Sequence, residues 1–142
     1  MATKQYVTFS IDGYLLGLDV LRVQEINRFL DITPAPGAPA YVRGLVNLRG
    51  QTLTVFDLGI RLGLAARRPL TEESHNVVLK QQLVGLLVDS IGNIVQCDEA
   101  GIEQCPANAC RIQADFVDGV VRLEEQLLII LRPEKILEYA GN

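Results

Sequence analysis

Hydrophobic and polar residues alternate with a period of two along much of the chain, which is typical of β-strands. Residues 6–9 and 15–20 flank Asp12-Gly13, a dipeptide typical of a two-residue hairpin turn. Residues 51–56 alternate cleanly after Gly50. Short runs rich in branched side chains predict strands buried on both faces: residues 77–80, 83–88 and 127–131. The pattern therefore predicts a mainly β protein.

Helical periodicity is scarce. The best candidate is a short C-terminal helix at residues 133–139, where Pro133 stands in the first turn and an acidic residue follows it. Further segments are predicted to be single turns or loops: residues 32–39, 38–42, 57–62 and 67–76.

An internal repeat divides the chain into two similar halves. Residues 41–51 match residues 116–126 without a gap at an offset of 75, and residues 16–18 resemble residues 84–86 at an offset of 68. Two copies of a small barrel explain this pattern. Because a barrel of about 60 residues has a thin core, we expect the two halves to share a buried seam.

The composition is that of a folded domain with weak attraction for polyanions. Of the 142 residues, 49% are hydrophobic and 21% charged, and the net charge is −4. Small barrels often bind single-stranded nucleic acid, but this use needs a basic groove with exposed aromatic residues. Aromatic residues make up only 6%, and the one basic cluster is Arg61, Arg67 and Arg68. Nucleic-acid binding is therefore the less favoured alternative.

Membrane targeting has no support in the sequence. No N-terminal signal peptide is recognised, because polar residues interrupt the first apolar run. The longest apolar runs, such as residues 127–131, are far shorter than the roughly 20 residues that cross a bilayer.

Residues that carry chemistry are few. Cys97, Cys105 and Cys110 lack metal-ligand spacing and are odd in number, which favours buried or half-buried free thiols in a reducing compartment. Ser74 adjoins the only histidine, His75, but neighbours in an extended segment point to opposite sides. No phosphate-binding glycine loop is present. We expect no catalytic residues, metal or cofactor, and an enzyme would need a pocket hidden at the seam.

Charged residues stand at unusual places in or beside the apolar strands. These are Glu25, Arg49, Asp57 and Asp89. Such residues are either solvent-exposed strand ends or members of partly buried ion pairs. A partly buried arginine–carboxylate pair contributes little net stability but fixes geometry, which is useful at a docking surface.

Eight short motifs follow one another in order between residues 4 and 139, and together they resemble the CheW family of bacterial chemotaxis coupling proteins. The motifs are Gln5-Tyr6-Val7-Thr8-Phe9, Gly17-Leu18-Asp19-Val20, Val23-Gln24-Glu25-Ile26, Pro36-x-x-Pro39-x-x-Val42-Arg43-Gly44, Asn47-Leu48-Arg49-Gly50, Val55-Phe56-Asp57-Leu58, Gly85-Leu86-Leu87-Val88-Asp89 and Glu134-Lys135-Ile136-Leu137.

The resemblance implies a mainly β fold of two interleaved five-stranded SH3-like β-barrels with a short C-terminal helix. It implies a single CheW-like domain over residues 4–140. We expect one subdomain at about residues 12–72 and the other at residues 4–11 together with 73–140.

The resemblance also implies a function without catalysis or a cofactor. Members of the family link the cytoplasmic tip of methyl-accepting chemoreceptors to the regulatory domain of the histidine kinase CheA. We therefore expect a cytoplasmic adaptor that is recruited to receptor arrays at the inner membrane and does not insert into the membrane. The sequence departs from the family pattern at Thr54 and at Arg132-Pro133. Flagellar chemotaxis and an array that controls pili or surface growth both stay open.

Six partner-binding residues are carried over from the family motifs. Glu25 and Arg49 are expected to form an ion pair that positions a receptor- or kinase-facing surface, the alternative being a purely structural pair. Val20, Val23 and Val88 are expected to line an apolar groove, the alternative being ordinary barrel core. The sixth is Asn47, in the same motif as Arg49.

Overall fold

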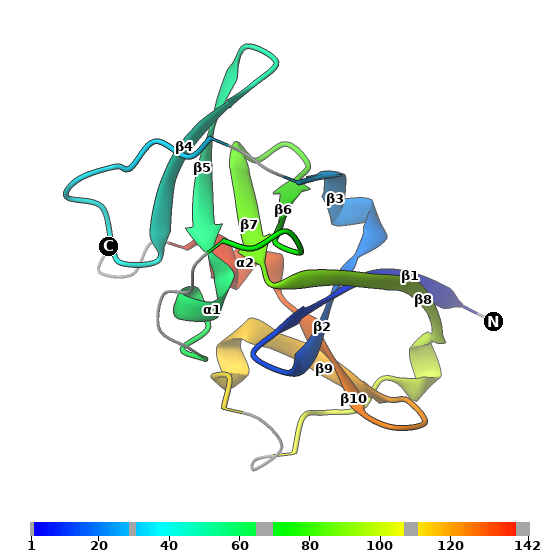
Figure 1. Ribbon diagram of the computed structural model, residues 1–142. Coiled ribbons are helices and arrows are strands. Elements are labelled where there is room, and N and C mark those ends of the chain that lie inside the picture. The colour runs from blue at the N-terminus through cyan, green and yellow to red at the C-terminus, as the bar shows by residue number, and fades with distance from the viewer. Residues whose placement is uncertain (1, 29–30, 65–69, 107–110, 139–142) are drawn as a thin grey trace.

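The computed structural model describes residues 2–28, 31–64, 70–106 and 111–138. Strands of this part of the chain form two five-stranded sheets, one above the other in Figure 1. One sheet has the order β8-β1-β2-β10-β9, and its strands are β1 (Thr3–Ile11), β2 (Tyr14–Asp19), β8 (Ser90–Asp98), β9 (Val117–Arg122) and β10 (Leu127–Leu131). The other has the order β3-β6-β7-β5-β4, and its strands are β3 (Val23–Asn27), β4 (Val42–Leu48), β5 (Gln51–Asp57), β6 (His75–Leu79) and β7 (Val84–Val88). The predicted fold class is confirmed.

Helical segments in the described residues are short. The α-helices are α1 (Leu58–Arg61) and α2 (Pro133–Leu137), and the 3₁₀ turns are η1 (Val20–Arg22), η2 (Glu99–Gly101) and η3 (Ala114–Phe116). Helix α2 begins at the predicted proline, while Tyr139 of the predicted helix lies outside the described residues. Both α-helices lie between the two sheets in Figure 1 and follow the last strand of a hairpin.

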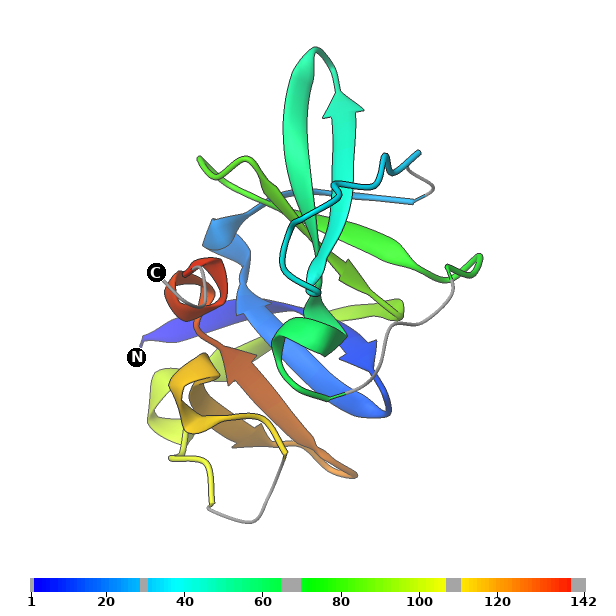
Figure 2. The ribbon, with the colours of Figure 1, turned by 90° about the vertical axis from the view of Figure 1, so that its left-hand side faces the viewer.

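The internal repeat is visible in the strand pairing. Hairpin β4–β5 corresponds to hairpin β9–β10, and each pairs in parallel with one further strand, β5 with β7 and β10 with β2. Figure 2 shows the β4–β5 hairpin extending beyond the rest of its sheet. The two segment matches found in the sequence thus mark equivalent places in two similar sheets.

The chain crosses between the sheets twice, and the expected limits of the two halves need correction. Strand β2 lies between β1 and β10, not in the half predicted at residues 12–72. Strands β6 and β7 lie beside β3 and β5, although they were assigned to the half containing residues 73–140. The changes of sheet occur after β2 and after β7.

Each sheet curls so that the segment following one edge strand pairs with the strand at the other edge: the segment after β3 pairs with β4, and the segment after β8 pairs with β9. Thr33 and Leu45 exchange two backbone hydrogen bonds of 2.8 Å, and Glu103 and Val120 do the same in the other sheet. A glycine precedes each receiving residue. A Cβ at Gly44 would lie 2.2 Å from the Thr33 carbonyl oxygen, so only glycine allows the two backbones to approach this closely.

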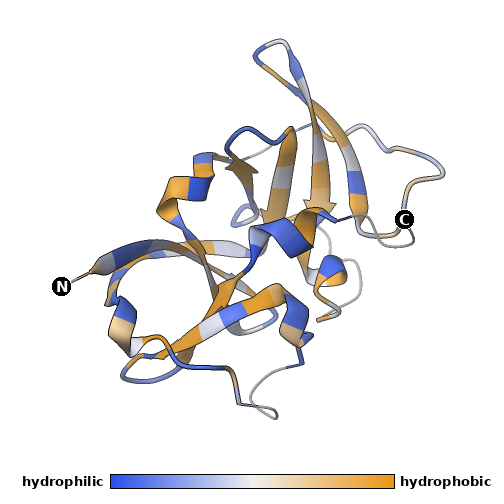
Figure 3. Cartoon of the chain, turned by 180° about the vertical axis from the view of Figure 1, so that it is seen from behind, coloured by the Kyte–Doolittle hydropathy of each residue, from blue (hydrophilic) through white to orange (hydrophobic). Residues whose placement is uncertain are grey.

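Buried residues in the described part of the chain form three hydrophobic clusters. The largest combines buried residues of both sheets, including Phe9 and Leu16 from one and Phe56 and Leu86 from the other. Two smaller clusters lie within the individual sheets. In the run Leu127–Leu131, alternate side chains face a small cluster and the shared one, which explains why it is apolar throughout. Figure 3 shows the hydrophobic residues along the strands and hydrophilic residues at the hairpin tips.

Arg61 joins the two halves at the shared core. Its guanidinium lies 4.8 Å from the ring centroids of both Tyr41 and Phe116, which occupy equivalent positions in the repeat. The same group donates hydrogen bonds of 2.9 Å to the carbonyl oxygens of Lys135 and Ile136, so it also caps the end of α2. The predicted buried seam is thus present.

We predict that Gly44→Ala disrupts closure of the barrel, because the added Cβ would clash with backbone at Thr33. The free energy of unfolding should fall by about 3 kcal/mol or more. Gly37→Ala is the matched control, since Gly37 also has a positive φ but nothing lies within 4 Å of its Cβ position. It should cost about 1 kcal/mol. Equal losses in urea unfolding followed by circular dichroism would contradict the closure argument.

We also predict that Arg61→Met lowers the free energy of unfolding by about 2–4 kcal/mol, because it leaves the Ile136 carbonyl without its donor and removes both ring contacts. Arg122→Met is the control, since Arg122 is exposed and pairs only with exposed Glu103. That variant should change stability by at most about 0.5 kcal/mol. Chemical denaturation measures both, and a similar loss in the two variants would refute the role of Arg61.

Candidate functional site

The predicted ion pair between Glu25 and Arg49 is present at the surface of the molecule. Glu25 lies on β3, one edge of its sheet, and Arg49 lies in the turn between β4 and β5, at the other edge. The Glu25 side chain is 20% exposed and the Arg49 side chain 67%. The pair therefore spans the closure of the barrel and leaves most of the Arg49 side chain exposed.

The turn that carries Arg49 has an unusual backbone. Arg49 and Gly50 both have positive φ, 49° and 84°, in a two-residue turn between the paired residues Leu48 and Gln51. The left-handed conformation costs a residue with a Cβ about 1 kcal/mol, so a feature of the surroundings must hold Arg49 there. Asn47 supplies one such contact, since its Oδ1 accepts a hydrogen bond of 3.1 Å from the Gly50 amide. The ion pair with Glu25 supplies a second.

Arg49 also borders a shallow surface depression of about 190 Å³. Glutamines line much of it, among them Gln24, Gln81 and Gln82, and the exposed Leu83 lies beside them. Of the residues that line it, arginine is the type enriched at protein interfaces.

The three valines predicted to line a groove belong to the shared core or pack against it. Val88 is 2% exposed and lies among the core residues, as in the alternative given for it. Val20 and Val23 are half-buried at the two ends of η1. Between them lies Leu21, which is 71% exposed and which sequence reasoning missed. An isolated leucine carries no periodic signal that distinguishes a surface residue from a core residue.

Turn η1 is tied to the C-terminal helix. Arg22 Nη1 lies 2.6 Å from Glu134 Oε2, and this hydrogen bond lowers the pKa of the Glu134 carboxyl group. The contact holds the valine-bearing segment against α2, so the exposed Leu21 projects from an anchored turn.

The remaining strand-end acids have structural partners. Asp57 lies 3.1 Å from Arg43 with both side chains largely buried, and it also caps α1 by accepting a hydrogen bond from the Ile60 amide. Asp89 accepts a hydrogen bond of 3.0 Å from the Asp12 amide, which anchors the β1–β2 turn.

The side chains with catalytic or redox potential are held apart. Ser74 Oγ accepts a hydrogen bond from the Thr71 amide, whereas His75 Nδ1 contacts the carbonyl oxygen of Glu73. Burial raises the pKa of the Cys97 thiol, which disfavours the reactive thiolate. Burial, with help from the Asp19 charge, likewise raises the pKa of Tyr6 to about 12. No metal-binding group of three or more ligands occurs within the described ranges.

The residues of the predicted basic cluster and the third cysteine do not form a site in the described part of the chain. Arg61 of the basic cluster is engaged at the seam, while Arg67, Arg68 and Cys110 lie outside the described residues. Where the structure describes the chain, it contains no helix long and apolar enough to cross a membrane.

Comparison with known proteins gives a consistent result. A model of the CheW-like domain matches residues 5–141. The chemotaxis protein CheW of Treponema pallidum is 31% identical over 140 residues, covering 93% of this chain and 81% of that protein. The corresponding protein of Rhizobium meliloti is 29% identical, covering 94% and 86%. The crystal structure of the scaffolding protein TtCheW from Thermoanaerobacter tengcongensis superimposes with a TM-score of 0.89 and 31% identity, covering 99% of this chain and 97% of that one.

Proposed function

The chain belongs to the CheW family of chemotaxis scaffold proteins, and we propose that it couples methyl-accepting chemoreceptors to a CheA-type histidine kinase. It acts without catalysis, as a bridge that holds the cytoplasmic receptor tip and the regulatory domain of the kinase in one complex. Its work is then cytoplasmic, at receptor arrays on the inner membrane.

The Glu25–Arg49 pair is the single observation that carries this proposal. An exposed ion pair contributes at most about 1 kcal/mol to stability, so stability alone does not account for it. The pair instead holds a strained, exposed arginine at the rim of a depression lined by glutamines. Arginine in such a position is well suited to contact a partner's carboxylates or backbone carbonyl groups.

The segment from Val20 to Val23 supplies the apolar part of the proposed docking surface. Leu21 is its most exposed member, with Val20 and Val23 half-buried on either side. Val88 contributes from within the core by supporting the shape of this surface, and Asn47 contributes by fixing the Arg49 turn. An exposed leucine on an anchored turn suits the apolar face of a helical partner, which is the form of a receptor tip.

The same scaffold could serve flagellar chemotaxis or an array that controls pili or surface growth. Both functions would use the same docking contacts, so the structure does not distinguish them. The identity of the neighbouring genes would show which of the two pathways the protein serves.

We predict that Arg49→Glu weakens binding to the kinase regulatory domain or to the receptor tip by about tenfold or more, because it removes an exposed cation and places two acids side by side. The melting temperature should stay near that of the wild type, since the Arg49 side chain is 67% exposed. Pull-down with each partner, followed by a receptor-coupled kinase assay, measures the effect.

Arg122→Glu is the matched control, because Arg122 is 68% exposed and also pairs with a glutamate, 3.1 Å away, on the other sheet. It should leave binding within about twofold of the wild type if the docking surface includes Arg49 and not this region. Unchanged binding by Arg49→Glu, or its failure to fold, would reject the proposed site.

A further inference from the structure

The turn that presents Leu21 is held at both ends and also from the side of α2. At its start, Asp19 Oδ1 accepts a hydrogen bond of 3.0 Å from the Leu21 amide. At its end, the Arg22 carbonyl oxygen accepts a hydrogen bond of 2.9 Å from the Lys80 amide, just after β6. The contact with α2 is the ion pair of Arg22 with Glu134, and Figure 2 shows this helix, in red, beside the turn between β2 and β3. Glu134 thus reaches the turn from the far end of the chain.

Helix α2 is itself anchored at the seam of the molecule. Ile136 is fully buried in the shared core, and its carbonyl oxygen accepts a hydrogen bond of 2.9 Å from Arg61. Arg61 belongs to α1, which follows the last strand of the other half. Because α2 is held in this way, the pair of Glu134 with Arg22 fixes the turn relative to both barrels.

The charged side chains next to Leu21 are paired within the molecule. Asp19 Oδ2 lies 3.8 Å from Lys4 Nζ, and Arg22 Nη1 lies 2.6 Å from Glu134 Oε2. What the turn presents to solvent is therefore the apolar side chain of Leu21. The Arg22 and Glu134 side chains are 40% and 58% exposed, and an exposed ion pair adds little to the stability of a fold. Breaking the pair should thus release one side of the turn and leave the fold intact.

We propose that Glu134 is a positioning residue for receptor docking: through Arg22 it holds Leu21 in the orientation in which this leucine meets the receptor tip. The inference rests on the proposed function, since it takes Leu21 as a contact for the apolar face of a helical partner. An apolar side chain that is held in its bound orientation before the partner arrives loses less conformational freedom on binding. The C-terminal helix thereby takes part in docking without touching the receptor.

The test measures the affinity of the full chain for a soluble helical hairpin that contains the cytoplasmic tip of a methyl-accepting chemoreceptor from the same organism. Glu134→Arg should weaken this binding about three- to fivefold, because two arginines then repel each other where the pair held the turn. The charge swap, Arg22→Glu with Glu134→Arg, restores opposite charges and should return the affinity to within about twofold of the wild type. Isothermal titration calorimetry measures all three affinities.

Glu138→Arg is the matched control. Glu138 directly follows α2, is exposed, and its carboxylate lies 3.2 Å from Lys135, a neighbour on the same segment. The variant makes the same change of charge as Glu134→Arg but does not touch the contact with Arg22. It should bind the receptor hairpin within about twofold of the wild type. The melting temperatures of Glu134→Arg and Glu138→Arg should both stay near that of the wild type.

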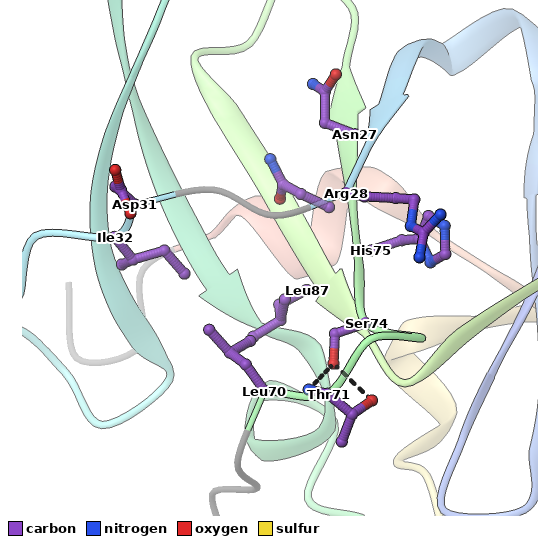
Figure 4. Close-up of a pocket in the computed structure, with 10 residues that line it drawn as sticks. Asn27, Arg28, Asp31, Ile32, Leu70, Thr71, Ser74, His75 and Leu87 are labelled. Carbon is purple, nitrogen blue, oxygen red and sulfur yellow. Dashed lines mark hydrogen bonds between the residues drawn. The ribbon is translucent and has the colours of Figure 1, made fainter.

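Leu21→Ala tests the proposed function in the same assay and should weaken receptor binding about tenfold or more. Leu70→Ala is its control, because Leu70 is also an exposed leucine but lies with Ile32 and Leu87 at a pocket of about 380 Å³ (Figure 4). The described residues that line this pocket include none from η1 or α2. Leu70→Ala should bind as the wild type does. If Leu21→Ala also binds as the wild type does, the apolar docking surface of the proposed function is wrong.

Two results would overturn the role of Glu134 while leaving that docking surface in place. One is a loss of binding in Leu21→Ala with no loss in Glu134→Arg. The other is a charge swap that binds as weakly as Glu134→Arg, because the two side chains would then act by contacting the receptor and not by pairing. If Glu134→Arg does not fold, Glu134→Ala removes the pair without repulsion, and full receptor affinity of that variant would reject the proposal.

Discussion

Closure of each sheet by one pair of backbone hydrogen bonds is the constraint on which the other features depend. Thr33 and Leu45 close one barrel, and Glu103 and Val120 close the other. Closure brings β3 close to the β4–β5 hairpin, although β3 and β4 are the first and last strands in the sheet order. Glu25 on β3 can therefore pair with Arg49 in the hairpin turn. It also covers the small hydrophobic cluster of each sheet. A glycine at the closing position is therefore a condition of the site as well as of the fold.

The crossings of the chain between the sheets make the two barrels one folding unit. A barrel of this size buries too little apolar surface to be stable alone. Here each sheet contains strands from both copies of the repeat, so neither sheet can form without the other half of the chain. The shared cluster and Arg61, which contacts Tyr41 and Phe116, connect the halves through their core. A scaffold gains from this arrangement, because partners that contact different barrels are held at a fixed separation.

The sequence predicted elements that depend on local pattern and missed features that depend on distant contacts. Alternation and the repeat revealed the hairpins and the strands of the core, including the run Leu127–Leu131. The predicted limits of the halves were wrong because they divided the β1–β2 hairpin and because the pairing of β6 with β3 and of β7 with β5 depends on contacts between distant segments. The resemblance supplied the Glu25–Arg49 pair. The exposure of Leu21 and the burial of Asn76 had no signal, because one residue in a short segment does not reveal which face it occupies.

The repeat offers an internal comparison that separates structural charges from functional ones. Arg43 and Asp57 form a buried pair, and the residues 75 positions later, Asp118 and Arg132, also pair, with their signs exchanged and their oxygen and nitrogen 3.6 Å apart. Two opposite charges, in either order, thus connect the same two segments in both halves. The pair of Glu25 and Arg49 has no such counterpart: Glu124 stands 75 residues after Arg49, and Asn93 stands 68 residues after Glu25. Both halves close in the same way, so closure does not require this pair. The half that has it differs in placing its arginine in a left-handed turn beside a surface depression, which is the feature that the proposed docking surface would use.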